Sequence, residues 1–229
     1  MRKYKHIYFD LDRTIWDFEG NSYQTIRDLV EKFNLNPIDP DDFHRVYTYF
    51  NEQHWAMFRE GKINKEKLRL ERFIKTLEEF KIYDNQLAEK IALEYIKIGP
   101  TKTGLIPHAK EILEELSHKY ALYVITNGFI EIQTDKLRNS GISSYFKRVF
   151  TSEHARSSKP DHGIFEYALT AVNARKKESL MIGDDLELDI IGAKTFGIDQ
   201  VYYNPLQLKQ SVHATYEIMS LLELKQILL

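Results

Sequence analysis

Four groups of polar residues carry side chains that could transfer a phosphoryl group if folding brought them together. The groups are Asp10 with Asp12, Thr126 with Asn127, Lys159, and Asp184 with Asp185. All except Lys159 directly follow short apolar runs rich in β-branched and aromatic residues, a pattern typical of buried strands that end in loops. Lys159 lies in a Ser-Ser-Lys-Pro loop just before a predicted helix. Because ligands of open parallel sheets bind at the carboxyl ends of the strands, we expect the four groups to meet at one edge.

These residue types suit chemistry at phosphorus. A carboxylate such as Asp10 can attack a phosphoryl group and form an aspartyl phosphate, provided that charge repulsion with the anionic substrate is offset. Mg²⁺ prefers oxygen ligands, which the Asp10 and Asp184 side chains and the main-chain carbonyl near Asp12 could supply. Lys159 would provide a further positive charge. The Asp12 carboxyl could protonate the leaving oxygen and later activate water, and Thr126 with neighbouring N–H groups could hold the phosphoryl oxygens.

The elements that must position these residues alternate between strands and helices in most of the chain. Strands are predicted over residues 6–9, 121–125, 149–151, 179–182 and 200–203, with a last strand and helix within 215–229. Helices are predicted over residues 107–118, 129–139, 161–172 and 188–196, and Gly197 is expected to end the last of these in a left-handed conformation. This alternation predicts an α/β fold, in which a Rossmann-like open parallel sheet carries helices on both faces.

The stretch from about residue 21 to about residue 99 differs, because it shows helical periodicity and no convincing strand. Apolar residues at helical spacing mark about four helices, the first through Ile26, Leu29, Val30 and Phe33. We therefore predict an all-helical cap that is inserted after the first strand. The predicted boundaries are 17–102 for this cap, and 1–16 with 103–229 for the catalytic α/β core.

The composition bounds the function further. Of the 229 residues, 43% are hydrophobic, which is enough for a sizeable core. The 32 basic and 34 acidic residues nearly balance, so the chain lacks the electrostatic footprint of a protein that binds a nucleic acid polymer. It has no cysteine, which excludes disulfides and thiolate zinc sites. There is no signal-peptide pattern and no apolar run of about eighteen residues. We therefore expect a cytoplasmic protein without membrane partners, either a monomer or a homodimer.

In chain order, the polar groups resemble the four motifs of the haloacid dehalogenase superfamily. The matching segments are Asp10-Leu-Asp-Arg-Thr14, Thr126-Asn-Gly128, Lys159-Pro160 and Gly183-Asp-Asp-Leu-Glu-Leu-Asp189. The resemblance spans nearly the whole chain, and the helical insert has the position of this superfamily's common cap. It implies that Asp10 is the nucleophile and Asp12 the general acid and base. It also implies that Thr126, Asn127 and Lys159 bind the phosphate, and that Lys159 stabilises the negative charge on the phosphoryl group during catalysis.

The resemblance also implies a Mg²⁺ cofactor. Its ligands would be the side chains of Asp10 and Asp184 and the main-chain carbonyl of Asp12. The resemblance further implies that Thr14, Asp185 and Asp189 support these ligands without binding the ion directly. Asp189 could alternatively reach the ion through a water molecule.

Within the superfamily, the segments Phe9–Phe18, Ile125–Gly128 and Ala214–Leu221 look like those of the pyrimidine 5′-nucleotidases. This resemblance implies that the partner is a small phosphate ester, with a pyrimidine nucleoside monophosphate as the substrate. Arg13 departs from the family's pattern, which has a small or short polar residue at this position. If Arg13 points toward the cap it would alter the choice of substrate, whereas an Arg13 in solvent would change nothing.

Three other functions remain open. The dehalogenase branch of the superfamily attacks carbon without a metal, but it typically lacks a carboxyl at the position of Asp12. A phosphatase or phosphomutase for another small metabolite, such as a sugar phosphate, would differ mainly in the cap. A non-catalytic binding module of the same fold would be expected to have lost Asp10, Lys159 or Asp184, and all three are present.

Overall fold

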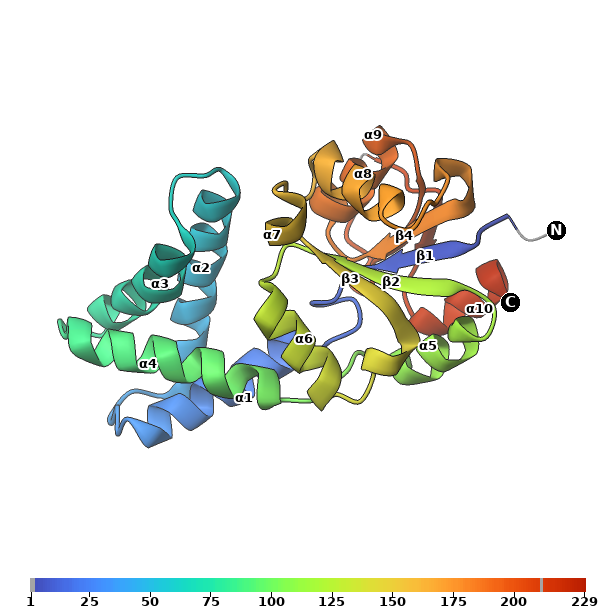
Figure 1. Ribbon diagram of the computed structural model, residues 1–229. Coiled ribbons are helices and arrows are strands. Elements are labelled where there is room, and N and C mark those ends of the chain that lie inside the picture. Colours follow the sequence, from blue (N-terminus) through green and yellow to red (C-terminus); the bar gives the residue numbers. More distant parts are fainter. Residues whose placement is uncertain (1–2, 211) are drawn as a thin grey trace. The chain divides into compact units, whose positions relative to one another are not determined.

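The computed structural model describes residues 3–210 and 212–229, which form two compact units (Figure 1). The core contains the chain up to Phe18 together with Thr103–Leu229, and the cap contains Glu19–Lys102. The chain therefore leaves the core soon after its first strand and returns to it before the second. Two stretches that are separate in sequence combine in one sheet.

The core is built on six parallel strands in the spatial order β3-β2-β1-β4-β5-β6. They are β1 (His6–Phe9), β2 (Ala121–Thr126), β3 (Phe146–Thr151), β4 (Ser179–Gly183), β5 (Asp199–Tyr203) and β6 (Tyr216–Ile218). The central strands β1, β2 and β4 are buried along almost their whole length, which explains why they read as continuous apolar runs. The predicted open parallel sheet is confirmed.

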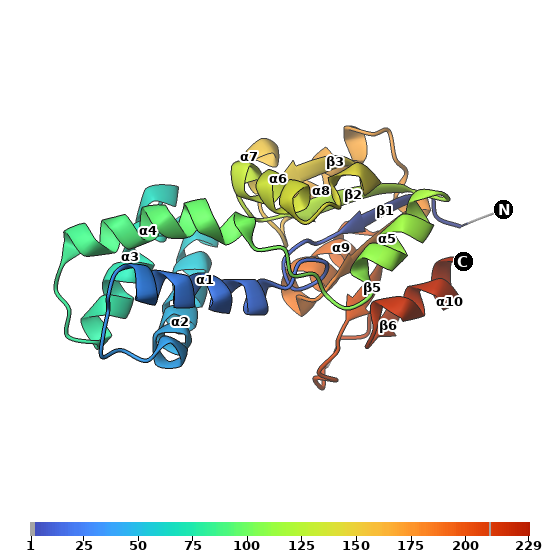
Figure 2. The same ribbon diagram turned by 90° about the horizontal axis from the view of Figure 1, so that it is seen from below.

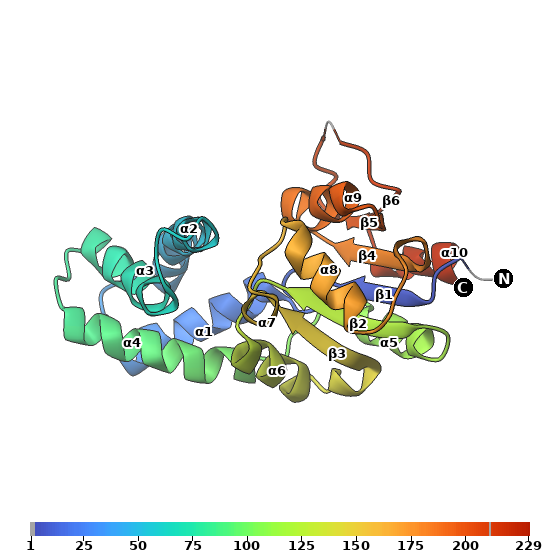
Figure 3. The same cartoon turned by 45° about the horizontal axis from the view of Figure 1, so that its top comes forward.

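Helices cover both faces of this sheet (Figure 2, Figure 3). The core helices are α5 (Ala109–Ser117), α6 (Ile130–Asn139), α7 (Ser152–Ala155), α8 (His162–Thr170), α9 (Gly192–Phe196) and α10 (Leu224–Leu228). One face buries Leu113 of α5, Leu137 of α6 and Leu224 of α10. The other face buries Phe165 of α8 and Phe196 of α9, whose rings stack 5.8 Å apart. Each Å² of apolar surface removed from water stabilises this arrangement by about 25 cal/mol.

The segment after β4 differs from its prediction. We expect a regular helix over residues 188–196, but a wide π-helical turn covers Leu186–Ile191 and α9 follows it. The Asp185 side chain caps the turn, and the Ile190 N–H reaches back five residues to the Asp185 carbonyl at 3.3 Å. Gly197 ends α9 at a φ of 96°, as predicted. The four-residue helix α7 was not predicted.

Four helices form the cap, and Figure 1 shows them in blue to green. They are α1 (Phe18–Lys32), α2 (Pro40–Arg59), α3 (Lys65–Glu79) and α4 (Asn85–Ile98). Side-chain oxygens of Asp39, Asn64 and Asp84 cap the first turns of α2, α3 and α4 and satisfy N–H groups that have no partner within the helix. The cap interior is aromatic, with the Tyr47 and Phe73 rings stacked 5.0 Å apart.

The strand order explains where a site can form in the core. Phe9 at the end of β1 pairs with Val124 of β2 on one side and with Ile182 of β4 on the other. The chain continues from β1 to β2 and β3 on one side of this strand, and from β4 to β5 and β6 on the other. The loops after β1 and β4 therefore lead away from each other. Such a switch in direction opens a crevice at the carboxyl ends of the strands. None of the helices in the described part of the chain combines the length and apolar character needed to cross a membrane.

Candidate active site

The ammonium group of Lys159 connects three parts of the core. Its Nζ donates to Asp10 Oδ1 at 2.5 Å, to Asp189 Oδ1 at 2.6 Å and to the Ile125 carbonyl at 3.1 Å. These acceptors use all three N–H donors of an ammonium group. Lys159 is 2% exposed and Asp10 is 7% exposed. The carboxylate predicted as the nucleophile therefore lies against the predicted cation, away from bulk water.

Asn127 holds the main chain of Lys159. Its Nδ2 donates to the Lys159 carbonyl at 3.0 Å, and its Oδ1 accepts the Lys159 N–H at 2.8 Å. Asn127 follows β2, so this pair of bonds attaches the Ser-Ser-Lys-Pro loop to the end of the sheet. We expect Asn127 to bind phosphate, but its side chain is committed to Lys159. Any contact of Asn127 with phosphate would fall to its main-chain N–H.

The residues after β4 contribute Asp184, Asp185 and Asp189 to the site, and Thr14 from the loop after β1 contacts one of them. Thr14 is fully buried, and its hydroxyl donates to Asp184 Oδ1 at 3.0 Å. The main-chain N–H of Asp185 donates to Asp189 Oδ2 at 3.1 Å. Gly183 is the last residue of β4, and a Cβ at that position would overlap the Asp189 carboxylate. The glycine is thus required because Asp189 packs against the end of β4.

The buried charges perturb one another. Burial raises the pKa of Asp10 to about 7, against the opposing effect of Lys159. Burial and the nearby Asp10 raise the pKa of Asp184 to about 7, and burial raises that of Asp189 to about 6. Burial alone would lower the pKa of Lys159, but the Asp10 and Asp189 carboxylates outweigh it and raise this pKa. Asp10 and Asp189 thus share one lysine while Asp184 lies close to both carboxylates, which leaves an excess of negative charge that a cation would offset.

The acidic side chains fit a hard divalent cation. One carboxylate oxygen from each of Asp10, Asp184 and Asp189 lies within 4.8 Å of the other two. Oxygen ligands on one side, with room left for water and phosphate, are the donor set that Mg²⁺ takes beside a phosphoryl group. The sequence predicts Asp10 and Asp184 as side-chain ligands and Asp189 as their support. The structure brings all three together, with Asp189 also bound to Lys159.

Two residues that the sequence did not single out contact Asp12, and one of them, Gln133, also contacts Thr126. Lys136 Nζ lies 2.5 Å from Asp12 Oδ1, and Gln133 Nε2 donates to Asp12 Oδ2 at 2.9 Å and to Thr126 Oγ1 at 2.8 Å. Both belong to α6. A signal was present, because Phe129, Gln133, Lys136 and Leu137 recur at helical spacing and form the buried face of this segment. A lysine and a glutamine on a buried helix face indicate that polar side chains from other segments of the chain bind them.

The residues that follow Asp12 turn back onto the core. Arg13 adopts a φ of 66°, and its guanidinium carbon lies 4.6 Å from the centroid of the Phe18 ring. Trp16 is almost fully buried, and Lys136 Nζ lies 4.2 Å from its ring centroid. Arg13 also lowers the pKa of Asp184 in part, opposing the effect of burial. Arg13 thus contributes positive charge near the acidic cluster.

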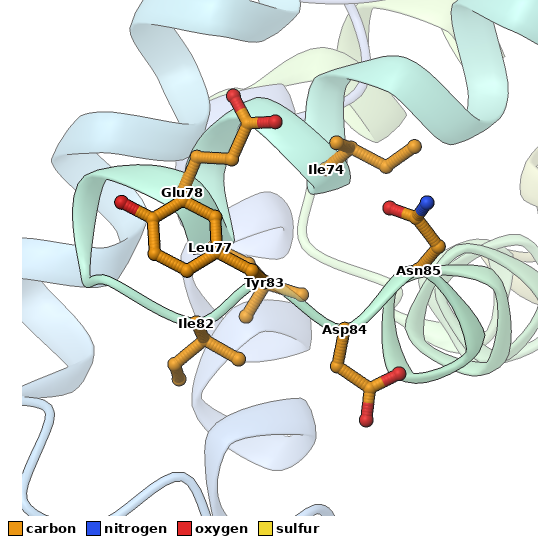
Figure 4. Close-up of a pocket in the computed structure, with 7 residues that line it drawn as sticks. All are labelled: Ile74, Leu77, Glu78, Ile82, Tyr83, Asp84 and Asn85. Atoms are coloured by element: carbon orange, nitrogen blue, oxygen red, sulfur yellow. The ribbon is translucent and has the colours of Figure 1, made fainter.

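A separate pocket of about 230 Å³ lies within the cap, between the end of α3 and the start of α4 (Figure 4). It is lined by Ile74, Leu77, Glu78, Ile82, Tyr83, Asp84 and Asn85. None of these residues belongs to the predicted motifs.

Comparison with known proteins places this geometry in a family. Residues 7–202 match the haloacid dehalogenase-like hydrolases. The HAD-hydrolase YfnB of Bacillus subtilis is 33% identical over 233 residues, which cover 100% of this chain and 97% of YfnB. A crystal structure of YfnB bound to magnesium superposes with a TM-score of 0.90 at 30% identity and covers 99% of both chains.

Two named enzymes are also similar. The pyrimidine 5′-nucleotidase PynA of Streptococcus pneumoniae is 33% identical, with 95% of this chain and 92% of PynA covered. The pyrimidine 5′-nucleotidase YjjG of Escherichia coli is 28% identical, with 99% of this chain and 98% of YjjG covered. The family match spans most of the chain, and these relatives align with it over nearly their whole length. The chain therefore belongs to the haloacid dehalogenase-like hydrolases.

Proposed function

We propose that this protein is a magnesium-dependent phosphatase that forms an aspartyl phosphate on Asp10, with pyrimidine nucleoside monophosphates as its substrates. The observation that carries the proposal is the buried Asp10–Lys159 ion pair beside Asp184 and Asp189. A carboxylate held against one lysine, with two further carboxylates available for a cation, has the parts needed for attack on an anionic phosphorus centre.

The first half-reaction transfers the phosphoryl group to the protein. A carboxylate oxygen of Asp10 forms a bond to phosphorus as the bond to the leaving oxygen breaks. The Asp12 carboxyl gives its proton to that oxygen, so the leaving group departs as an alcohol. Lys159 offsets negative charge on the transferred group, and the Thr126 hydroxyl donates to one of its oxygens.

The second half-reaction returns the protein to its starting state. The Asp12 carboxylate takes a proton from water, and the resulting hydroxide attacks phosphorus, breaks the bond to Asp10 and releases inorganic phosphate. Asp10, Asp184 and the Asp12 carbonyl would hold Mg²⁺, with Asp189 supporting these ligands, and the ion would supply positive charge that offsets the charge of the phosphoryl group. Asp12 then carries the proton needed for the next cycle.

The presence of Asp12 favours this chemistry over dehalogenation. Attack on carbon releases halide, which needs no proton, whereas an alkoxide leaving group needs an acid. The pyrimidine nucleotide as substrate is supported by the similarity to PynA and YjjG, both of which align over nearly their whole length.

Phosphate release from a panel of nucleotides and sugar phosphates, with Mg²⁺ and with chelator, tests the proposal. We expect magnesium-dependent release that is fastest for pyrimidine nucleoside monophosphates. Faster release from sugar phosphates would support the proposed phosphatase mechanism but would overturn the assignment of nucleotides as the substrates. Interconversion of sugar phosphates without net release would indicate a mutase, and no turnover of any phosphate ester would indicate a non-catalytic binding module.

A further inference from the structure

Helix α6 presents two buried polar side chains to the reactive residues. Gln133 has no exposed surface and Lys136 is 6% exposed. They are three residues apart, so they lie on the same face of the helix. Each binds a different oxygen of the Asp12 carboxylate, at 2.9 Å and 2.5 Å. One helix therefore holds both oxygens of the proposed general acid.

The contacts of Gln133 also set the direction of the Thr126 hydroxyl. Thr126 Oγ1 accepts the Gly128 N–H at 3.0 Å and the Gln133 Nε2 donor at 2.8 Å. A hydroxyl has two acceptor positions and one hydrogen to donate. Because both acceptor positions are occupied, the hydrogen must point to a third partner. Thr126 is thereby prepared to donate to an oxygen of the phosphoryl group.

The orientation of the Gln133 amide is determined by its partners. Asp12 Oδ2 and Thr126 Oγ1 both accept from Gln133 Nε2, so the amide presents its NH₂ group to them. The two hydrogens of Nε2 are then shared between Asp12 and Thr126. Gly128 is part of the same arrangement, because a Cβ at that position would overlap the Gln133 amide. The glycine of the Thr-Asn-Gly segment thus makes room for the glutamine.

Lys136 contributes charge as well as position. Its ammonium lies 4.2 Å from the Trp16 ring centroid and 5.7 Å from that of Phe18. In the described part of the chain, Asp12 is its only carboxylate partner within ion-pair distance. A buried ammonium requires a compensating anion, so Lys136 and Asp12 restrict each other. The two aspartates of the first motif therefore each have their own lysine: Lys159 for Asp10 and Lys136 for Asp12.

We infer that Gln133 and Lys136 are positioning residues of the phosphoryl-transfer site. Lys136 holds the Asp12 carboxyl toward the leaving oxygen, and Gln133 aligns both Asp12 and the Thr126 hydroxyl. The inference rests on the proposed function, since it assigns these residues to the same site. It makes α6 the element that couples the acid to the phosphate-binding hydroxyl.

Leaving-group dependence separates this role from a purely structural one. Uridine 5′-monophosphate releases an alkoxide that needs the acid, whereas 4-nitrophenyl phosphate releases a stable phenolate that does not. The constant kcat/KM includes the step in which the leaving group departs. General acid catalysis contributes about 10²- to 10⁴-fold, so we expect Lys136→Met to lower kcat/KM about 10- to 100-fold for the nucleotide and less than about 3-fold for the aryl ester.

Two further variants of α6 complete the experiment. Lys136→Arg retains the charge and should recover most of the loss on the nucleotide. Arg138→Met alters the same helix at a side chain that is 67% exposed, and it should leave both substrates unaffected. Gln133→Met should weaken inhibition by inorganic phosphate about 3- to 10-fold, the effect of one lost hydrogen bond, whereas Lys136→Met should not.

The outcomes distinguish the inference from the proposed function. Equal losses of kcat/KM on both substrates in Lys136→Met, together with a lower melting temperature, would show that Lys136 only supports the fold. Unchanged turnover of the nucleotide in Lys136→Met would also overturn the inference, and in both cases the phosphatase would stand. Failure of the unmodified protein to release phosphate from either ester would instead remove the proposed function, and with it the inference.

Discussion

The side-chain amide of Asn127 binds the main chain of Lys159 on both sides, accepting its N–H at 2.8 Å and donating to its carbonyl at 3.0 Å. The main-chain carbonyl of Asn127 accepts a hydrogen bond from the Ser152 hydroxyl at 3.1 Å. Lys159 is therefore positioned from two directions: its main chain by Asn127, and its ammonium by Asp10, Asp189 and the Ile125 carbonyl.

Replacement of Asn127 should affect catalysis through Lys159. In Asn127→Ala the loop around Lys159 loses both bonds to the end of β2, and displacement of a reacting group by about 1 Å costs about 100-fold in rate. We expect kcat/KM to fall about 10- to 100-fold, with an unfolding free energy lower by about 1–3 kcal/mol. Steady-state kinetics and urea denaturation measure the two effects. Full activity in a destabilised variant would show that Asn127 supports the fold without positioning the lysine.

Asp10→Asn should abolish turnover and preserve the fold, because an amide cannot act as the nucleophile. The substitution removes one of the two carboxylates that bind Lys159, and Asp189 remains as the partner of the ammonium. We therefore expect little change in melting temperature. Acid-quenched protein should carry a base-labile phosphate after reaction of the unmodified chain and none after reaction of the variant. A variant that still turns over would exclude Asp10 as nucleophile.

The acidic cluster should make stability depend on pH and on magnesium. In the folded chain the pKa values of Asp10 and Asp184 are raised to about 7 and that of Asp189 to about 6, from an ordinary value of 3.8. The folded state therefore holds protons that the unfolded chain releases. This contribution to stability is present in full below about pH 3.8 and is lost progressively as the pH rises from there to between 6 and 7.

A cation that binds the ionised carboxylates should offset that loss. We expect Mg²⁺ to raise the melting temperature more at pH 8 than at pH 5, because protons compete with the ion at the lower pH. Thermal denaturation at both pH values, with Mg²⁺ and with chelator, measures the difference. Asp184→Asn should reduce the magnesium effect. An increment that is equal at both pH values would argue against binding at these carboxylates.

Gly183→Ala should damage the site through packing. The added methyl group would overlap the Asp189 carboxylate, which cannot move without losing Lys159 and the Asp185 N–H. Overpacking of this kind costs about 1–3 kcal/mol in unfolding free energy. Gly99→Ala is the matched control, since its nearest atoms would lie 3.9 Å from the new Cβ. Similar melting temperatures and activities for the two variants would contradict the proposed packing.

The sequence alone determined most of the elements of this protein and the place of its reactive residues within them. Strands such as His6–Phe9 and Ser179–Gly183 are buried on both faces and therefore appear as apolar runs, and each is followed by the residues of a motif. Parallel strands in alternation with helices bring those motifs to one edge. Periodicity and turn residues act over a few positions, so one chain contains enough information to predict them.

Only the tertiary structure decided which side chains meet. Gln133 and Lys136 lie more than 120 residues from Asp12, and their contact depends on the order of the strands and on the face of the sheet that α6 covers. The same holds for Asn127, whose sequence position indicates phosphate and whose side chain instead binds Lys159. Local periodicity can show that a polar residue is buried. It cannot name the partner, because that partner is set by pairing between segments distant in the chain.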